Sequence, residues 1–150
     1  MTLIDESGRS WTLAVIGYQF PEAGRRSDRW DRNWLQVRVR CEGPSGAWER
    51  SDPALTTWDV AELVGWLRGH SADTIEFMEP SLAFERTDPM RLTMVLDHGL
   101  RPPVSADRPE AADDRTPVRV EFSAPPSDFD ALATSLAANA GRFPPREADQ

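Results

Sequence analysis

Short segments in which apolar and polar residues alternate recur along the chain, and they constrain its fold more than any other feature. The cleanest is residues 34–41, WLQVRVRC, where one face collects Leu35, Val37, Val39 and Cys41. A period of two predicts a strand with one face in the core. Similar patterns predict further strands at 3–5, 11–20, 47–53, 73–78, 81–86, 91–96 and 118–122.

Two segments instead have the spacing of amphipathic helices. Residues 57–69 place apolar side chains at i, i+3, i+4 and i+7, with Thr56 and Asp59 as a capping box and Gly69 as a stop. Residues 128–140 repeat the pattern, and there we expect Ser127 to be the cap and Gly141 to end the helix. Both assignments rest on local signals alone.

The order of these elements predicts an α+β fold. Consecutive strands with short connections favour a mainly antiparallel, meandering sheet of about seven to eight strands, accompanied by two α-helices. A sandwich and a barrel are both compatible with this order. We expect a single domain over residues 1–150, with a proline-rich mobile loop at 101–117 and a frayed tail at 147–150.

Composition narrows the classes of function. The formal net charge of −8 disfavours direct contact with nucleic acid and favours basic protein partners. No apolar run is long enough to cross a membrane, and the single cysteine excludes an internal disulfide. The first residues, MTLIDESGRS, lack the basic start and apolar stretch of a secretion signal, so we expect a cytoplasmic protein.

No motif for catalysis, metal binding or cofactor binding stands out. The chain has no glycine-rich phosphate loop, GxSxG, CxxC or HExxH, so we predict no enzyme, no metal and no cofactor. His70 closes the predicted helix at 57–69, and His98 lies beside a predicted turn. Ordinary structural or surface roles are favoured for both. Cys41 falls on the inward face of its strand, as a small apolar residue would. Asp28, Asp31 and Asn33 lack the spacing of a calcium loop.

Glu79, in FMEPSLAFE, is the strongest single candidate for a carboxylate with chemistry. A glutamate followed by Pro80 between two strand patterns is more typical of a turn, because proline pre-sets the backbone angle that a turn needs. We therefore predict a turn for Glu79, with its charge available to a partner. A hydrolase using Glu79 and a second acid stays an alternative.

Several short motifs together resemble a known family. GYQFP (17–21), DRNWLQVRV (31–39), Trp48 with DPALTTWDVAELVGWL (52–67), FMEPSLAFE (77–85) and RFPPR (142–146) look like the WapI-type immunity proteins of bacteria. The resemblance follows the same order over nearly the whole chain. It does not include the proline-rich segment at 101–117.

The resemblance implies a small cytoplasmic protein that neutralises the C-terminal domain of a contact-dependent toxin, expected here to be a basic nuclease. We predict neutralisation by occlusion, through acids and aromatic anchors, since aromatic residues are enriched at binding hot spots. The expected toxin-contacting residues are Asp28, Trp30, Asp31, Trp34, Trp58 and Glu79. A scaffold or small-ligand domain with a pocket lined by tryptophan and phenylalanine stays a further alternative. No oligomeric state is predicted.

Overall fold

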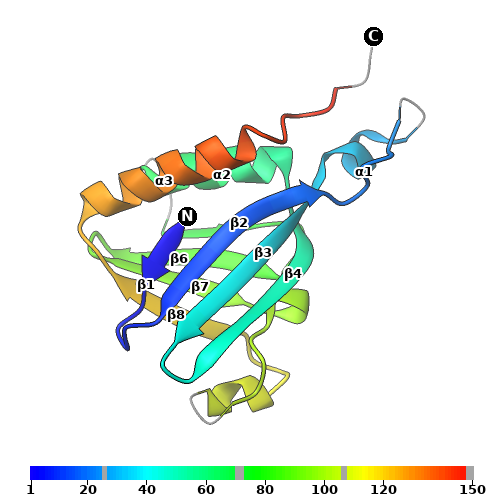
Figure 1. Ribbon diagram of the computed structural model, residues 1–150. Coiled ribbons are helices and arrows are strands. Elements are labelled where there is room, and N and C mark those ends of the chain that lie inside the picture. The colour runs from blue at the N-terminus through cyan, green and yellow to red at the C-terminus, as the bar shows by residue number, and fades with distance from the viewer. Residues whose placement is uncertain (25–26, 70–72, 106–107, 148–150) are drawn as a thin grey trace.

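The computed structural model describes residues 1–24, 27–69, 73–105 and 108–147 (Figure 1). Within these residues, two antiparallel sheets of four strands each and three α-helices make up the fold. The strands are β1 (Thr2–Ile4), β2 (Ser10–Tyr18), β3 (Trp34–Gly43), β4 (Gly46–Thr56), β5 (Thr74–Glu76), β6 (Leu82–Asp88), β7 (Arg91–Leu96) and β8 (Val118–Ser123). The helices are α1 (Arg29–Asn33), α2 (Thr57–Leu67) and α3 (Pro126–Ala140). The predicted α+β class and antiparallel meander are confirmed.

The two sheets lie face to face, and α2 and α3 run side by side across one end of them (Figure 1). Each sheet is a meander, in the order β1-β2-β3-β4 and β5-β6-β7-β8, and in the described residues neither closes into a barrel. Trp11 is central to the core between them. Its ring meets Trp48 edge-on at 5.5 Å in its own sheet and Phe122 at 6.4 Å in the other. One continuous core therefore joins both layers.

The first sheet follows the predicted alternation closely. Gly8 adopts a φ of 83° in the turn between β1 and β2, a conformation that glycine takes without a steric penalty. The inward residues of β3, Leu35, Val37, Val39 and Cys41, are all buried. β2 lies between β1 and β3, as its two apolar faces predicted, although Ile16 on the outer face stays exposed. The outer face of the sheet is thus only partly covered.

The strand β4 is longer than the sequence indicated. We expected it to end near Pro53, but it continues to Thr56. Leu55 pairs with Leu35 while Asp52 pairs with Val37, so β4 carries one extra residue at this point. Proline is tolerated in such a bulge on an edge strand because no ladder hydrogen bond depends on its missing N–H. The bulge lets the chain pass Pro53 and lead directly into α2.

The helix α2 begins at Thr57, as its sequence predicted, and ends at Leu67, two residues before the predicted end at Gly69. The Thr56 hydroxyl accepts a hydrogen bond from the Asp59 N–H at 3.2 Å, and the Asp59 carboxylate accepts one from the Thr56 N–H at 2.7 Å. Gly69 follows the helix with a φ of 86°. The predicted stripe of Val60, Leu63, Val64 and Leu67 is buried.

The start of α3 differs from the prediction. Pro125 is the N-cap, without a side-chain hydrogen bond, and the helix begins at Pro126. Proline suits the first helical position, where no N–H is needed and φ is already helical. Ser127 therefore lies inside the first turn and does not cap it. The predicted stop at Gly141 and the buried face of Phe129, Leu132, Ala133 and Leu136 are confirmed.

The helix α1 lies in residues 21–33, for which no strand or helix was predicted. It has five residues and no apolar periodicity, so no pattern could mark it. Asp28 caps it by accepting a hydrogen bond from the Asp31 N–H at 2.8 Å. Two helices were therefore predicted, whereas the described residues contain three.

Thr56, which caps α2, and Ser127, which was predicted to cap α3 but does not, give a matched test of these assignments. Thr56→Ala is expected to lower the free energy of unfolding by about 1 kcal/mol, because the capping box of α2 is lost. Ser127→Ala should change it by less than about 0.5 kcal/mol, since Ser127 makes no cap. Urea denaturation followed by circular dichroism measures both. Equal losses in the two variants would contradict the observed start of α3.

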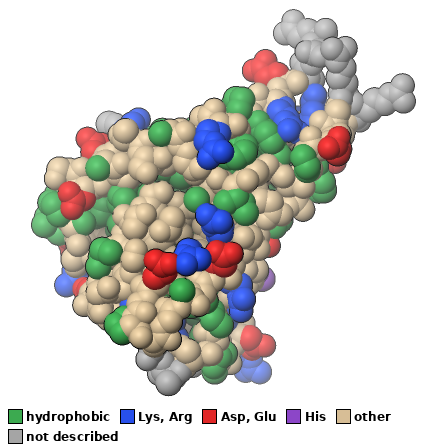
Figure 2. All heavy atoms as spheres, viewed as in Figure 1, with side chains coloured by type: hydrophobic (Ala, Val, Ile, Leu, Met, Phe, Trp, Pro, Cys, Tyr) green, Lys and Arg blue, Asp and Glu red, His purple; other side chains and the backbone are tan. Residues whose placement is uncertain are grey.

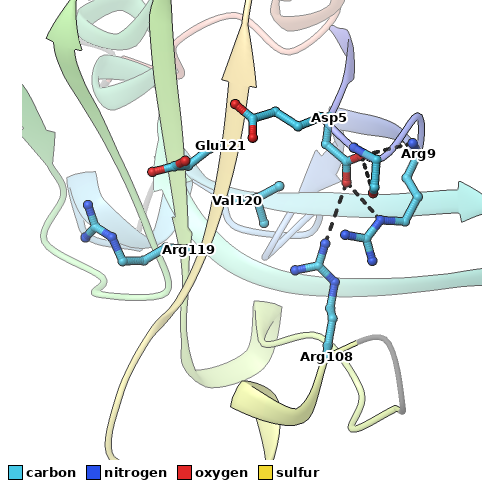
Figure 3. Close-up of a pocket in the computed structure, with 8 residues that line it drawn as sticks. Asp5, Arg9, Arg108, Arg119, Val120 and Glu121 are labelled. Atoms are coloured by element: carbon cyan, nitrogen blue, oxygen red, sulfur yellow. Dashed lines mark hydrogen bonds and ion pairs between the residues drawn. The ribbon is translucent and has the colours of Figure 1, made fainter.

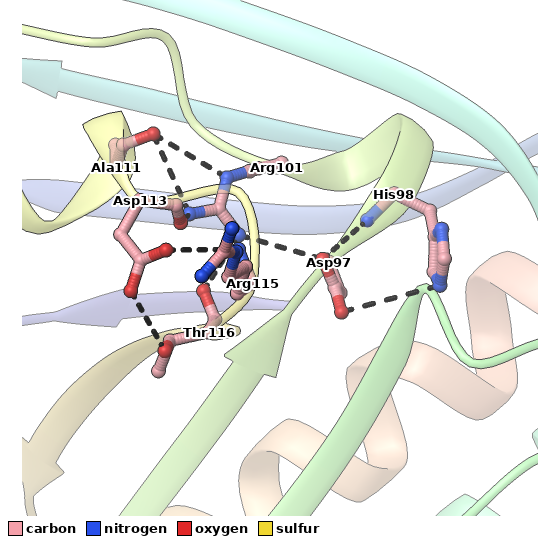
Figure 4. A network of polar contacts seen from close by, with 7 residues as sticks. All are labelled: Asp97, His98, Arg101, Ala111, Asp113, Arg115 and Thr116. Carbon is pink, nitrogen blue, oxygen red and sulfur yellow. Dashed lines mark hydrogen bonds and ion pairs between the residues drawn. The ribbon is translucent and has the colours of Figure 1, made fainter.

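The proline-rich segment at 101–117 lies at the end of the sheets opposite α2 and α3 (Figure 1). Its described residues include a short 3-10 turn, Pro109–Ala112, and the buried Ala111. The Arg101 side chain donates to the carbonyls of Ala111, Asp113 and Thr116 and so holds the returning chain (Figure 4). Mobility of this segment stays a prediction. The expected tail at 147–150 and the role of His70 fall on residues outside the described ones, except for Glu147.

Candidate partner-binding surface

The corner formed by α1 and the start of α2 brings two tryptophans together. The rings of Trp30 and Trp58 meet edge-on, with centroids 5.4 Å apart, and Trp30 keeps 45% of its surface exposed. The Arg29 guanidinium lies 4.4 Å above the Trp58 ring, within range of a cation–π interaction. An exposed aromatic side chain fixed by a second ring is a suitable anchor for a partner.

The other predicted contact residues on α1 are part of the same corner. Asp28 and Asp31 are exposed at the start of the helix, where negative side chains are favoured by its dipole. Trp34 ends the helix by donating its N–H to the Trp30 carbonyl, and it is half-buried. Five of the six residues predicted to contact a toxin thus gather at one end of the molecule. Their contact with a toxin stays a prediction.

Asn33 holds this corner together. The side chain is fully buried and uses its full hydrogen-bonding capacity. Its oxygen accepts from the Thr57 hydroxyl at 3.0 Å and from the Arg146 N–H at 2.8 Å. Its amide donates to the carbonyls of Arg29 at 2.9 Å and Arg146 at 3.0 Å. One side chain therefore joins α1, α2 and the C-terminal segment.

The C-terminal segment 142–147 packs along the first sheet. The Tyr18 hydroxyl donates to the Pro144 carbonyl at 2.6 Å, and the Tyr18 ring meets Phe143 edge-on at 5.8 Å. The Arg146 guanidinium stacks 3.5 Å over the Tyr18 ring. It also donates to the Phe20 and Pro21 carbonyls, each at 3.2 Å. Motifs GYQFP, DRNW, TTWD and RFPPR, which are distant in the sequence, meet here.

Two cavities flank this segment. An apolar groove of about 370 Å³ lies between α2 and α3, and it is bordered by Val60, Ala61, Val64, Ala137, Ala140 and Phe143. A smaller pocket of about 220 Å³ adjoins it, formed by Arg29, Arg32, Trp58, Pro145, Arg146 and Glu147. We call them the α2–α3 groove and the arginine pocket. Sequence reasoning missed the arginines, whose only signal was their place in the motifs DRWDRN and RFPPR.

Glu79 lies apart from this corner in the fold. It is half-buried in the connection between β5 and β6, in the second sheet, so the predicted turn is confirmed. The neighbouring Ser81 hydroxyl donates to the Asp52 carboxylate on β4 and so ties this turn to the first sheet. Whether Glu79 meets a partner stays a prediction.

A second charged site surrounds Asp5, beside a cavity of about 370 Å³ (Figure 3). Arg9 and Arg108 point toward the buried Asp5 carboxylate, while Arg119 and Glu121 project from β8 (Figure 3). Asp5 accepts hydrogen bonds from the Ser7 N–H and hydroxyl, the Arg9 N–H and Nε, and Trp11 Nε1. Arg108, from the proline-rich segment, lies 3.8 Å from it.

Electrostatics keeps this carboxylate ionised. Burial raises the pKa of Asp5, but the hydrogen bonds from Trp11, Ser7 and Arg9 and the charge of Arg9 outweigh it and lower the pKa to about 2. A carboxylate with so many donors is suited to anchoring. It fixes the β1–β2 turn and the proline-rich segment to each other.

The remaining candidates have structural surroundings. Cys41 is buried, and burial raises the pKa of its thiol, which disfavours the reactive thiolate. His98 starts a 3-10 turn and has a φ of 44°. Its backbone N–H donates a hydrogen bond to the Asp97 carboxylate at 2.9 Å (Figure 4). Among the described residues, no three of the histidine, cysteine, aspartate and glutamate side chains are grouped to hold a metal ion.

On the face seen in Figure 2, the charged side chains are dispersed. Figure 2 shows acidic and basic side chains interspersed in small groups, and neither sign forms a large patch on that face. The net charge of −8 gives the molecule a long-range negative field, and on this face it is not gathered into one acidic surface. In the described part of the chain, none of the helices is long and apolar enough to cross a bilayer.

Comparison with known proteins identifies the family. A model described as the immunity protein WapI-like family matches residues 2–144, which confirms the resemblance seen in the motifs. No curated protein and no solved structure matches the chain. The match includes both sheets, all three helices and Asn33, and it ends at Pro144, before Arg146. The chain therefore belongs to the WapI-like immunity protein family, a membership that points to toxin immunity.

Proposed function

We propose that this protein binds the toxic domain of a partner toxin and neutralises it by covering its working surface, without catalysis. The observation that carries this proposal is the exposed Trp30, held edge-on against Trp58 on a rigid corner. Large aromatic side chains that are already fixed lose little entropy on binding, so they make effective anchors. The family membership supports a toxin as the partner.

The class of toxin is also a proposal. A nuclease that grips nucleic acid is basic, and a protein with a net charge of −8 attracts such a domain over long distances. The attraction accelerates encounter, whereas the aromatic anchor determines how long the complex lasts. We therefore expect association rates that fall with added salt and dissociation rates that respond to Trp30.

Co-expression with the C-terminal domain of a toxin encoded next to this gene tests the proposal. The wild type should restore growth and co-purify with the toxin domain. Titration of purified protein against the toxin's nuclease activity should end at about one equivalent, because occlusion requires one inhibitor per toxin. Full neutralisation by a small fraction of an equivalent would instead indicate catalysis and overturn the occlusion mechanism.

Trp30→Ala gives the corresponding mutational prediction. The affinity for the toxin domain should fall by about 30-fold or more, because a hot-spot aromatic contributes about 2 kcal/mol or more. Ile4→Ala, at an apolar residue on the edge strand β1 that is 58% exposed, is the matched control and should bind like the wild type. Isothermal titration calorimetry measures both. Unchanged affinity for Trp30→Ala in a folded protein would remove Trp30 from the interface.

A further inference from the structure

The α2–α3 groove is a concave apolar surface on the outside of the core. Val60 and Val64 form its floor on α2, and Ala137 and Ala140 border it on α3. Small side chains on both helices leave the space of about 370 Å³, which accepts a large apolar side chain. The C-terminal segment, through Phe143, closes one side of it.

The arginine pocket continues the groove, since Pro145 borders both cavities. Within the part of the chain that the structure describes, none of its three arginines forms an ion pair with a carboxylate. Arg32 donates to the Asp28 and Glu147 carbonyls at 3.3 Å, and Arg146 donates to those of Phe20 and Pro21. These acceptors are neutral carbonyls. One carboxylate, that of Glu147, borders the pocket.

Arg29 is the group best placed to meet a ligand. It is exposed, and its guanidinium is stacked over Trp58 at 4.4 Å. Its backbone carbonyl accepts from Asn33, but its side chain forms no hydrogen bond or ion pair with any residue the structure describes. A guanidinium held by its face presents its N–H edge outward. That edge matches the two oxygens of a carboxylate.

We propose that one segment of the toxin domain docks here, with an apolar side chain in the α2–α3 groove and an adjacent aspartate or glutamate carboxylate in the arginine pocket. The inference rests on the proposed function and names the chemistry that this surface recognises. Charge complementarity selects the carboxylate, and the shared border at Pro145 places the apolar side chain next to it. The long-range field favours a basic toxin, whereas this local contact fixes its orientation.

Two pairs of matched variants test the surface. Ala61→Trp fills the groove, and Glu62→Trp places the same side chain on a neighbouring exposed position of α2. Arg29→Glu reverses the charge of one pocket residue at a helix start that tolerates glutamate, and Arg50→Glu makes the same change outside the pocket, on the exposed face of β4. Ala61→Trp and Arg29→Glu should weaken binding by about 30-fold or more, and the two controls by less than about threefold. Unchanged circular dichroism and melting temperature show that each variant is folded.

Charge reversal on the toxin identifies the carboxylate. Each aspartate and glutamate of the toxin domain is changed to arginine, and neutralisation by the Arg29→Glu variant is scored. Restoration by one of these substitutions is the expected result. If none of them restores neutralisation, the carboxylate contact is overturned.

The outcomes separate this inference from the proposed function. Wild type that neither binds nor neutralises the toxin domain overturns the proposed function, and the inference falls with it. Wild type that binds, together with Ala61→Trp and Arg29→Glu variants that bind equally well, leaves the function standing and overturns the inference alone.

Discussion

Replacing Asp5 by alanine is expected to lower the free energy of unfolding by about 3–5 kcal/mol at pH 7, the largest effect of any single substitution considered for this chain. The variant removes the acceptor of five hydrogen bonds in a buried site. Trp11 Nε1 then loses its acceptor, and the Arg108 guanidinium loses its 3.8 Å contact with the Asp5 carboxylate. Leaving buried donors and charges without partners costs more than a lost surface contact. Urea denaturation measures the loss.

The same prediction has a pH dependence with a defined sign. The pKa of Asp5 is lowered from 3.8 to about 2 in the folded protein, so the stabilisation is complete above pH 3.8 and is lost as the pH falls to about 2. A shift of this size corresponds to about 2 kcal/mol. The difference between wild type and Asp5→Ala should therefore narrow by about that amount between pH 5 and pH 2.

Asp88→Ala is the control for Asp5→Ala. Asp88 forms an exposed ion pair with Arg91 at 3.7 Å and accepts a hydrogen bond from the exposed Met90 N–H at 2.7 Å, and the loss of both should cost less than about 1 kcal/mol. A loss below about 1 kcal/mol for Asp5→Ala, close to that of the control, would show that the buried cluster contributes little. A pH-independent difference between wild type and Asp5→Ala would contradict the lowered pKa.

Asn33→Ala is expected to lower the free energy of unfolding by about 2–4 kcal/mol, because four hydrogen bonds of a buried side chain are lost together. It should also free the C-terminal segment, since the Arg146 N–H and carbonyl both depend on Asn33. Hydrogen exchange at the Arg146 amide should accelerate more than exchange in β3. Loss of the segment would also open the arginine pocket and weaken toxin binding.

Asn139→Ala provides the matched comparison for Asn33→Ala. Asn139 joins α3 to β2 through two hydrogen bonds to Val15, at 2.7 and 3.0 Å, next to a register shift in β2. Because Asn139 makes two hydrogen bonds where Asn33 makes four, Asn139→Ala should lower the free energy of unfolding by about half as much. It should leave hydrogen exchange at the Arg146 amide unchanged. Accelerated exchange at Arg146 in both variants, or in neither, would show that Asn33 does not hold the segment specifically.

The parts of the fold that were predicted correctly depend on neighbours in the sequence. The helix α2 carries its cap, its apolar stripe and its stop within fourteen residues, from Thr56 to Gly69. The alternation in β3 likewise fixes which side chains face the core. The start of α3 was wrong because the preference for serine at an N-cap was weighed without the stronger constraint of Pro126 at the first helical position.

The candidate surface was only partly accessible to sequence reasoning. Trp30 and the acids of the motif SDRWDRN were predicted as contacts, together with Trp34 and Trp58. The pairing of Trp30 with Trp58 and the arginines around them were not predicted. These contacts join segments that lie far apart in the chain. A single sequence carries no signal for such pairs, because neither member changes the local pattern of the other.

By itself, the sequence determined the strands, the α2 helix, the α+β class and the family, because local periodicity, capping and motif order are written in neighbouring residues. Only the tertiary structure decided that the strands divide into two packed sheets and that GYQFP, DRNW, TTWD and RFPPR meet at Asn33. Tyr18, Asn33 and Arg146 are far apart in the sequence and come into contact only when the chain folds. Their contacts hold the C-terminal segment beside the groove and the pocket that we propose for toxin binding.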